Sequence, residues 1–239
     1  GFVHTAPAHG ADDYLIGKVY GLPVDNPVGD DGCFLPNTPP LSVAPLVGKT
    51  VWEANPLVLQ ELQARGRLLH SEKIQHSYPH CWRHKTPIIF RATTQWFIGM
   101  EIQGLRPQAL GEIKQVRWIP DWGQARIEKM VENRPDWCIS RQLWWGHRIP
   151  AYYCQDCGEI NVSREDVKTC KKCASHNIKQ DEDVLDTWFS SGLWPVSTLG
   201  WPDKSEDFDY FYPTDVLVTG YDIIFFWIVR MVFSALEIT

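Results

Sequence analysis

The chain has 239 residues, of which 44% are apolar and 22% are charged, a composition typical of globular rather than disordered or fibrous proteins. The longest uninterrupted apolar run, residues 223–229, is far shorter than the ~20 residues that cross a bilayer. The N-terminus has no basic and apolar leader, so we expect neither a membrane nor a secretory role. The net charge of −6 argues against a general polyanion binder, although a local basic patch could still contact RNA.

The first fifty residues are dense in Gly, Pro and Asp, and their apolar stretches are too short for helices. We therefore predict strands and turns over residues 1–50. A helix is predicted over residues 56–65. Asn55 is a suitable N-cap for it, Pro56 suits the first helical position and Gly66 supplies a stop signal.

The middle of the chain mixes both kinds of secondary structure. Short apolar runs predict strands over residues 87–90 and 96–98. Ile127 and Val131 lie four positions apart on one face of a predicted helix, which is expected to end near Asn133.

The last forty residues contain the pattern of a strand, a turn and a buried helix. Residues 216–218 are typical of a buried strand, and Thr219 with Gly220 predicts the turn. A largely apolar helix of about 15 residues is expected to begin at Asp222. This order predicts a βα unit of a parallel sheet, with a ligand at the carboxyl end of the strand.

Four of the seven cysteines form two C-x-x-C pairs. Each pair can deliver two thiolates from one tight turn, and four sulfurs complete the tetrahedral coordination of a structural zinc ion. The pattern indicates metal binding before disulfides, and therefore a reducing, cytoplasmic compartment. The alternatives are that His176 replaces one cysteine, or that the reduced ribbon holds no metal. The predicted ligands are Cys154, Cys157, Cys170 and Cys173.

Two histidines and two acids lie close together near the N-terminus, namely His4, His9, Asp12 and Asp13. A carboxylate beside an imidazole suits either the binding of an ammonium group or the steering of a water molecule. From the residues alone, adjacent acids in a Gly- and Pro-rich turn are more often solvated turn formers or caps than catalytic groups.

Trp188 and Trp227 flank the predicted βα crevice, and Ile223 and Asp222 lie close to Trp227 in the sequence. Aromatic walls with one branched aliphatic side chain and one acid would form a small apolar pocket for a group that carries an ammonium. The alternative is that both tryptophans are core residues. A second His and Cys cluster has irregular spacing, which favours structural roles for His76, His80, Cys81 and His84.

Longer motifs resemble the class I aminoacyl-tRNA synthetases of the isoleucyl and valyl branch, and the resemblance covers essentially the whole chain. Residues 1 to about 136 resemble an isoleucyl enzyme, and residues from about 143 to 239 resemble a valyl enzyme, with the change inside the shared stretch 136–142. The isoleucyl-like motifs are residues 4–14, 76–87 and 118–123, and the valyl-like motifs are residues 143–150, 154–173, 183–195 and 218–227.

The resemblance implies an α/β fold, as part of a Rossmann-type catalytic domain with the end of a β-rich editing insertion and a small zinc ribbon. It implies four segments. They are the C-terminal part of the editing domain (1–75), a catalytic segment with connecting helices (76–150), the zinc-ribbon insertion (151–180) and the second half of the Rossmann domain (181–239).

The resemblance also implies roles for individual residues. His4 and Asp13 are implied to act in editing, where the acid holds the α-amino group of a mischarged amino acid. Trp188 is implied to surround the amino-acid side chain, together with Ile223 and Trp227. Asp222 is implied to lie buried near the ammonium group. The implied adenylate contact is Thr219, which departs from the isoleucyl pattern in the valyl direction.

The family implies ATP with Mg as a cofactor, a structural zinc, tRNA(Ile) or tRNA(Val) as partner, isoleucine or valine as substrate, and a monomeric enzyme in the cytoplasm. The sequence contains neither of the family's two ATP-contacting motifs, so we expect an internal fragment that does not charge tRNA alone. The alternatives are a free-standing editing hydrolase and a zinc-ribbon binding module. Whether the isoleucyl-like and valyl-like halves come from one natural gene stays open.

Overall fold

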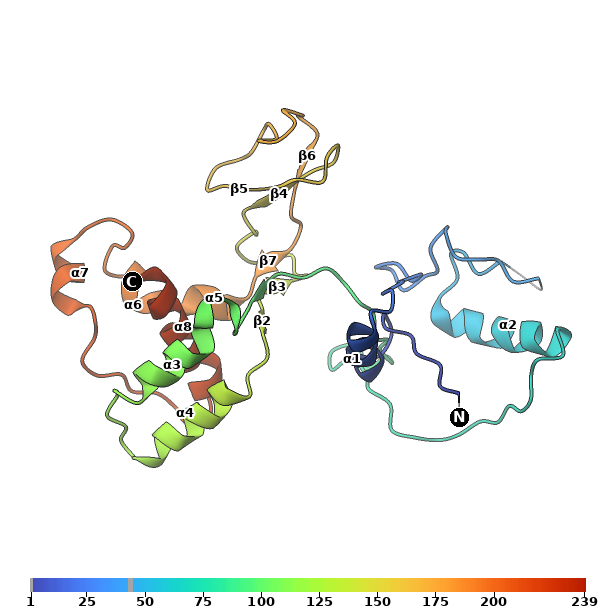
Figure 1. Cartoon of the computed structure of the whole chain (residues 1–239), viewed down its shortest axis with the longest axis horizontal. Coiled ribbons are helices and arrows are strands. Elements are labelled where there is room, and N and C mark those ends of the chain that lie inside the picture. Colours follow the sequence, from blue (N-terminus) through green and yellow to red (C-terminus); the bar gives the residue numbers. More distant parts are fainter. Residues whose placement is uncertain (1, 43–44) are drawn as a thin grey trace. The chain divides into compact units, whose positions relative to one another are not determined.

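The computed structural model describes residues 2–42 and 45–239. The chain divides into two compact units, Gly1–Thr94 and Gln95–Thr239, and each is described by itself (Figure 1). Among the described residues no helix is both long and apolar enough to cross a membrane.

The first unit contains a helix that the sequence interpretation missed. Helix α1, Ala11–Tyr20, begins after Gly10 in an extended conformation and ends at Gly21, whose φ of 63° is the left-handed conformation that glycine adopts at low cost. Acids in its first turn and Lys18 in its last turn complement the helix dipole. The prediction of turns around Asp12 and Asp13 is therefore wrong.

Helix α2, Val51–Ala64, begins earlier than predicted, because a capping box at Thr50 and Glu53 fixes its start. The Glu53 N–H donates to Thr50 Oγ1 at 3.3 Å, and the Thr50 N–H donates to Glu53 Oε2 at 2.8 Å. Asn55 is therefore not the N-cap, and Pro56 lies inside the helix. The capping box satisfies backbone donors that the first turn would otherwise leave unpaired.

The strands expected over residues 1–50 are reduced to isolated bridges in the described part of the first unit, and positions 1, 43 and 44 lie outside the described residues. The strand expected over 87–90 is likewise reduced to one bridge, at Pro87. The bridges are Val28 with Phe34, Cys33 with Thr50, Phe34 with Val47, and His80 with Pro87.

The second unit is built on a helical core. Helix α3 (Leu105–Ile113) follows the short 3-10 helix η1 (Ile102–Gly104) and packs against α4 (Trp122–Glu132) and α8 (Val229–Ile238), as Figure 1 shows. The helix predicted to end near Asn133 is confirmed as α4. The side chains that these helices bury together include Leu105, Ala109, Ile113, Ile127, Val131, Val229 and Phe233.

Two pairs of short antiparallel strands border this core. Strand β1 (Phe97–Ile98) pairs with β2 (Trp137–Cys138), and β3 (Ser140–Arg141) pairs with β7 (Val184–Leu185). The strand predicted over 96–98 is therefore confirmed in shortened form. The register of the second pair places Arg141 opposite Val184, so residues far apart in sequence meet at its end.

A three-stranded antiparallel sheet lies between β3 and β7 in the sequence. Its order is β5-β4-β6, with β4 at Ala151–Cys154, β5 at Ile160–Val162 and β6 at Ile178–Gln180. Three short helices follow β7, namely α5 (Thr187–Ser191), α6 (Trp194–Ser197) and α7 (Glu206–Phe211).

The buried strand predicted over residues 216–218 does not form. The segment has no regular structure, and Val216 and Val218 are 81% and 87% exposed. A strand exists through hydrogen bonds to a neighbour, and no described segment pairs with this one, so the predicted parallel sheet is absent from the described residues. The helix predicted from Asp222 begins two residues later, as the π-helical segment η2 (Ile224–Ile228) that continues into α8.

We expect Thr50→Ala to lower the free energy of unfolding of residues 2–94 by ~1 kcal/mol, since the Glu53 N–H loses its acceptor. Hydrogen exchange of the α2 amides measures this change. Thr50→Ser, which keeps the hydroxyl, is the matched control. Equal amide protection in the alanine and serine variants would show that the capping box does not stabilise α2.

Candidate functional site

The four predicted cysteine ligands converge in one cluster at the edge of the three-stranded sheet. Their sulfur atoms all lie within 4.8 Å of one another. Cys154 and Cys173 sulfurs are 3.5 Å apart, and those of Cys157 and Cys170 are 3.7 Å apart. Four sulfurs at ~2.3 Å from a tetrahedral zinc are ~3.8 Å apart, so this spacing fits zinc and is far too long for disulfides.

The backbone of both cysteine pairs explains this convergence. In each pair the N–H four residues after the first cysteine donates to that cysteine's carbonyl, Gly158 to Cys154 and Ala174 to Cys170, both at 2.9 Å. Gly158 and Ala174 have φ values of 72° and 58°. We call this turn a cysteine knuckle. This turn brings both sulfurs of a pair into the four-cysteine cluster.

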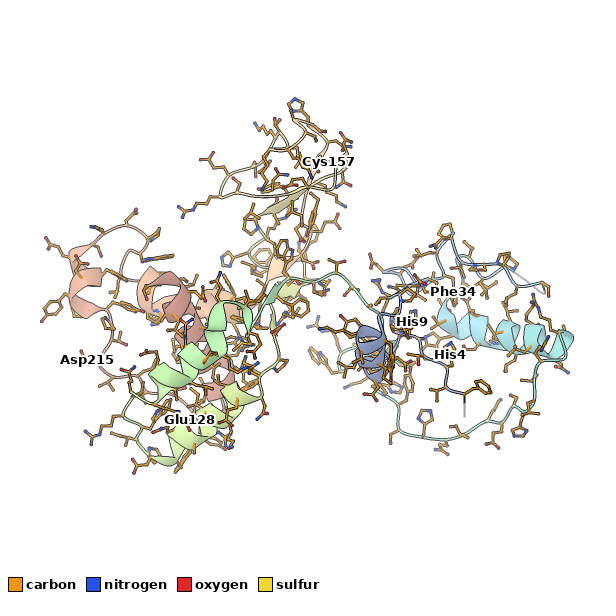
Figure 2. All side chains as sticks on the ribbon, viewed as in Figure 1. His4, His9, Phe34, Glu128, Cys157 and Asp215 are labelled. Carbon is orange, nitrogen blue, oxygen red and sulfur yellow. The ribbon has the colours of Figure 1, made fainter. Side chains whose placement is uncertain are left out.

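A buried asparagine joins strand β4 to the second knuckle. Asn161 on β5 donates through Nδ2 to the carbonyl of Tyr152, and its Oδ1 accepts from the Lys171 N–H at 3.0 Å. Cys154 and Cys170 are 1% and 3% exposed, while Cys157, in the turn after β4 (Figure 2), is exposed. This second layer of hydrogen bonds orients the ligands before any metal arrives.

The local electrostatics favour thiolate at one sulfur. The backbone N–H of Cys173, aided by that of Lys172, lowers the pKa of Cys170 to about 6 against the opposing effect of burial. The backbone N–H of Ser175 lowers the pKa of Cys173, but the neighbouring thiols of Cys157 and Cys154 outweigh it and raise that pKa to about 12. A bound cation would therefore favour the loss of the protons that Cys157 and Cys173 retain.

The alternative ligand His176 is not part of the cluster. Its Nδ1 lies 3.0 Å from the carbonyl of Lys168.

Cys81 lies in a turn with the same backbone pattern as the knuckles, because Lys85 N–H donates to its carbonyl and Lys85 has a φ of 58°. His84 Nδ1 is 3.5 Å from its sulfur. No group of three metal-binding side chains forms there among the described residues, and the structural role predicted for this segment stays a prediction.

A separate apolar cavity of about 300 Å³ lies between α5, α6 and η2. Trp188 and Trp227 both line it, and Trp194 is a third wall that the sequence interpretation missed. Trp227 Nε1 donates to the carbonyl of Ser191 at 3.3 Å. The Trp188 ring stacks on Phe226, with ring centroids 5.8 Å apart. The remaining lining residues are Ser190, Ser191 and Ser197.

The other predicted pocket residues lie outside the cavity lining. Ile223 is half-buried just before η2, and Thr219 is half-buried in the preceding segment. Asp222 is exposed, so its predicted burial is wrong. The cause is the unpaired segment over 216–218, which leaves the following turn at the surface.

The N-terminal cluster is only partly assembled. His4 and His9 lie on the segment before α1 (Figure 2). Asp13 Oδ2 accepts from the Ala6 N–H at 3.0 Å, so this carboxylate closes the turn that precedes the helix. His9 Nδ1 lies 3.0 Å from the carbonyl of Phe90. His4 is exposed and has no hydrogen bond among the described residues, while Asp12 is exposed in the first turn of α1.

We expect the chain to bind one zinc ion, and removal of zinc to release residues 151–180 from hydrogen-exchange protection while α3, α4 and α8 stay protected. The helical core contains none of the ligands, whereas a structural zinc supplies ~10–16 kcal/mol to the fold that it holds.

Cys170→Ser should abolish zinc binding, and Cys33→Ser, outside the cluster, should not.

Because the raised pKa values of Cys157 and Cys173 keep protons on those sulfurs, zinc affinity should rise by more than about tenfold per pH unit from pH 6 to 8. Competition titrations with a chelator at several pH values measure this slope. A pH-independent affinity would mean that the four thiols are not the ligands.

Comparison with known proteins supports the resemblance found in the motifs. The family model for class I tRNA synthetases (I, L, M and V) matches residues 43–239. The valine--tRNA ligase of Thermotoga maritima is 47% identical, covering 99% of this chain and 27% of the relative. The isoleucine--tRNA ligases of Dechloromonas aromatica and Haemophilus influenzae (strain PittGG) are 49% and 54% identical, covering 93% and 80% of this chain.

The chain spans only about a quarter of the length of these curated relatives, 26% and 22% of the two isoleucine enzymes. Both amino-acid specificities occur among them, so the names alone do not choose between valine and isoleucine. The family model nevertheless covers most of the sequence, including both cysteine pairs and the tryptophan-lined cavity. The chain therefore belongs to the class I tRNA synthetases, in the group that comprises the isoleucine, leucine, methionine and valine enzymes.

Proposed function

We propose that this chain is part of an aminoacyl-tRNA ligase that attaches a branched aliphatic amino acid to its tRNA through an aminoacyl-adenylate. The observation that supports this most directly is the cavity between α5, α6 and η2. Its three tryptophan walls suit an aliphatic side chain, and the serines supply a few polar contacts, as in most small-molecule sites. The names of the relatives agree with this chemistry.

The cavity is too permissive to choose between valine and isoleucine. One methylene is worth only ~1–3 kcal/mol in an apolar pocket, a limit for which this same enzyme group is the standard example. The alignments add one distinction. The isoleucine match runs over 251 positions while covering 93% of this chain, so that relative contains residues that this chain lacks. The valine match runs over 238 positions at 99% coverage. We therefore place valine ahead of isoleucine as the substrate.

The predicted mosaic of an isoleucyl-like and a valyl-like half stays a prediction. A valine enzyme aligns along 99% of the chain, including the isoleucyl-like half.

In our proposal the cofactors are ATP with Mg and a structural zinc, the partner is tRNA(Val) or tRNA(Ile), and the whole enzyme is a cytoplasmic monomer. Thr219 and Asp222 would contact the adenylate and the ammonium group once the segment at 216–223 has neighbouring strands.

A weakly selective pocket implies a second, hydrolytic selection step, and we place it at His4 and Asp13. The exposed His4 is free to face a substrate, while the hydrogen bond from Ala6 holds Asp13 in a fixed position. In this proposal Asp13 binds the α-amino group of a mischarged amino acid, and His4 lies near the ester.

The chain alone should give no ATP–pyrophosphate exchange with valine or isoleucine, since its sequence contains neither ATP-contacting motif. A reading frame extended to include both motifs should exchange with one of the two amino acids.

Trp227→Ala in the extended protein should raise the amino-acid KM by roughly 10- to 100-fold with a smaller effect on kcat, because the lost wall contacts the side chain before and during reaction.

Trp145→Ala is the matched control, since Trp145 is 87% exposed and lies outside the cavity. Exchange with neither amino acid in the extended protein would contradict the ligase proposal. Exchange by the present chain alone would contradict the assignment of ATP contacts to the two missing motifs.

The editing proposal predicts different results for two substitutions of Asp13. Asp13→Asn keeps an oxygen that can accept from the Ala6 N–H but removes the charge, whereas Asp13→Ala removes both. We expect both variants of the extended protein to lose hydrolysis of threonyl-tRNA(Val) or valyl-tRNA(Ile). Only the alanine variant should lower the stability of α1, by ~1 kcal/mol. Normal hydrolysis by the asparagine variant would limit Asp13 to a structural role.

A further inference from the structure

A buried carboxylate outside the cavity is shared by several elements of the second unit. Asp186 is 3% exposed and lies between β7 and α5. Its two oxygens have different partners. Oδ1 accepts from the Trp188 N–H at 3.2 Å, which makes Asp186 the N-cap of α5. Oδ2 accepts from Trp137 Nε1 and Arg141 Nη2, both at 2.9 Å.

A second arginine approaches the same oxygen from α8. Arg230 Nη2 lies 3.7 Å from Asp186 Oδ2, and Nη1 donates to the carbonyl of Phe226 at 2.7 Å. Its guanidinium carbon lies 4.6 Å from the ring centre of Trp137 and 5.8 Å from that of Trp188. Burial lowers the pKa of Arg230, while the charge of Asp186 opposes that effect.

We propose that Asp186 is a positioning residue for the amino-acid pocket, because its carboxylate links the Trp188 backbone to Trp137, Arg141 and Arg230. One oxygen holds the start of α5, which carries the Trp188 wall. The other oxygen fixes that start against β2, β3 and α8. The identification of the cavity as an amino-acid pocket rests on the function proposed above, whereas the positioning of Trp188 does not.

The cap alone does not explain this arrangement. An N-cap needs only a side-chain oxygen for the backbone of the first turn, and serine or asparagine would serve as well. At Asp186 the second oxygen meets donors from three other elements. An asparagine in the cap orientation would present an NH₂ group to these donors. The site therefore requires a carboxylate, and the position of Trp188 follows from both of its oxygens.

The test uses the present chain labelled with 5-fluorotryptophan and observed by ¹⁹F NMR. The Trp188 resonance is assigned by Trp188→Phe, and Trp144, which is 97% exposed, supplies the position of a solvated indole. Asp186→Asn keeps the cap but loses the acceptor at Oδ2. We expect the Trp188 signal to broaden and to move toward that of Trp144, although α5 keeps its N-cap.

Asp209→Asn is the matched control, because it removes the same charge from an exposed acid of α7 in the same unit. It should leave the Trp188 signal unchanged. Trp118 reports on the integrity of the helical core, since its Nε1 donates to the carbonyl of Ile113. If Asp186→Asn also collapses the Trp118 signal, Arg141→Gln replaces it, because the Arg141 side chain is 36% exposed. This change removes one of the donors to Asp186, together with the bonds from Arg141 to the carbonyls of Cys138 and Ser140.

The proposal is overturned if the Trp188 signal stays in place in both Asp186→Asn and Arg141→Gln while the Trp137 signal moves. The carboxylate would then hold Trp137 alone. Titration with L-valine or L-isoleucine separates the two proposals. If neither amino acid moves the Trp188 or Trp227 signal of the wild-type protein extended to include both ATP-contacting motifs, the amino-acid pocket is wrong. The dependence of Trp188 on Asp186 would still be measured in the absence of ligand.

Discussion

One buried carboxylate links four elements of the second unit. Asp186 contacts the neighbouring strands β2 through Trp137 and β3 through Arg141, α5 through its N-cap and α8 through Arg230. The strand pairs that these elements form are only two residues long. Such short ladders contribute little by themselves, so the side-chain network is what fixes their mutual arrangement.

Burying these charges has a cost that their geometry must offset. Taking ions out of water costs several kcal/mol each, and a pair recovers this only when further hydrogen bonds satisfy both groups. Asp186 is satisfied at both oxygens. Arg230 and Arg134 instead lie over aromatic rings, with Arg134 4.1 Å from the ring centre of Phe225. Burial, with a smaller contribution from Arg230, lowers the pKa of Arg134 to about 10, so it remains charged at neutral pH.

Features that depend on neighbouring residues could be predicted from the sequence, and those that depend on distant partners could not. The cysteine cluster was predictable because each knuckle is a local turn. The capping box at Thr50 and Glu53 is also a local signal, since the two residues lie three positions apart. Helix α1 gave no apolar period, because Gly17 is its only buried residue. The strand over 216–218 failed, since strand formation needs a partner elsewhere in the chain.

The candidate site also combines features that the sequence predicts with features that depend on tertiary contacts. Trp188 and Trp227 could be assigned to one pocket from motifs, but nothing local marks the link between Asp186 and Trp137, which are 49 residues apart. Two features of the sequence indicate a buried charge network here. One is the Asp at the N-cap position before α5. The other is Arg230, a charge within an apolar helix, which requires a buried partner. Which residue that partner is depends on tertiary contacts.

The cysteine cluster and the pocket are connected through the same short strands. The segment that carries the cysteines leaves the core after β3 and returns at β7, where the register places Arg141 beside Val184 and so brings Asp186 to its partners. Closing a flexible loop of roughly 40 residues costs about 3 kcal/mol in chain entropy. A folded ribbon removes most of that cost, because its ends already meet where the Asp181 N–H donates to the Ala151 carbonyl at 2.8 Å. The insertion therefore does more than form a cysteine cluster. Because the pairing of β4 with β6 holds its two ends together, the folded insertion lowers the cost of placing Asp186, and through Asp186 the Trp188 wall, in the arrangement seen here.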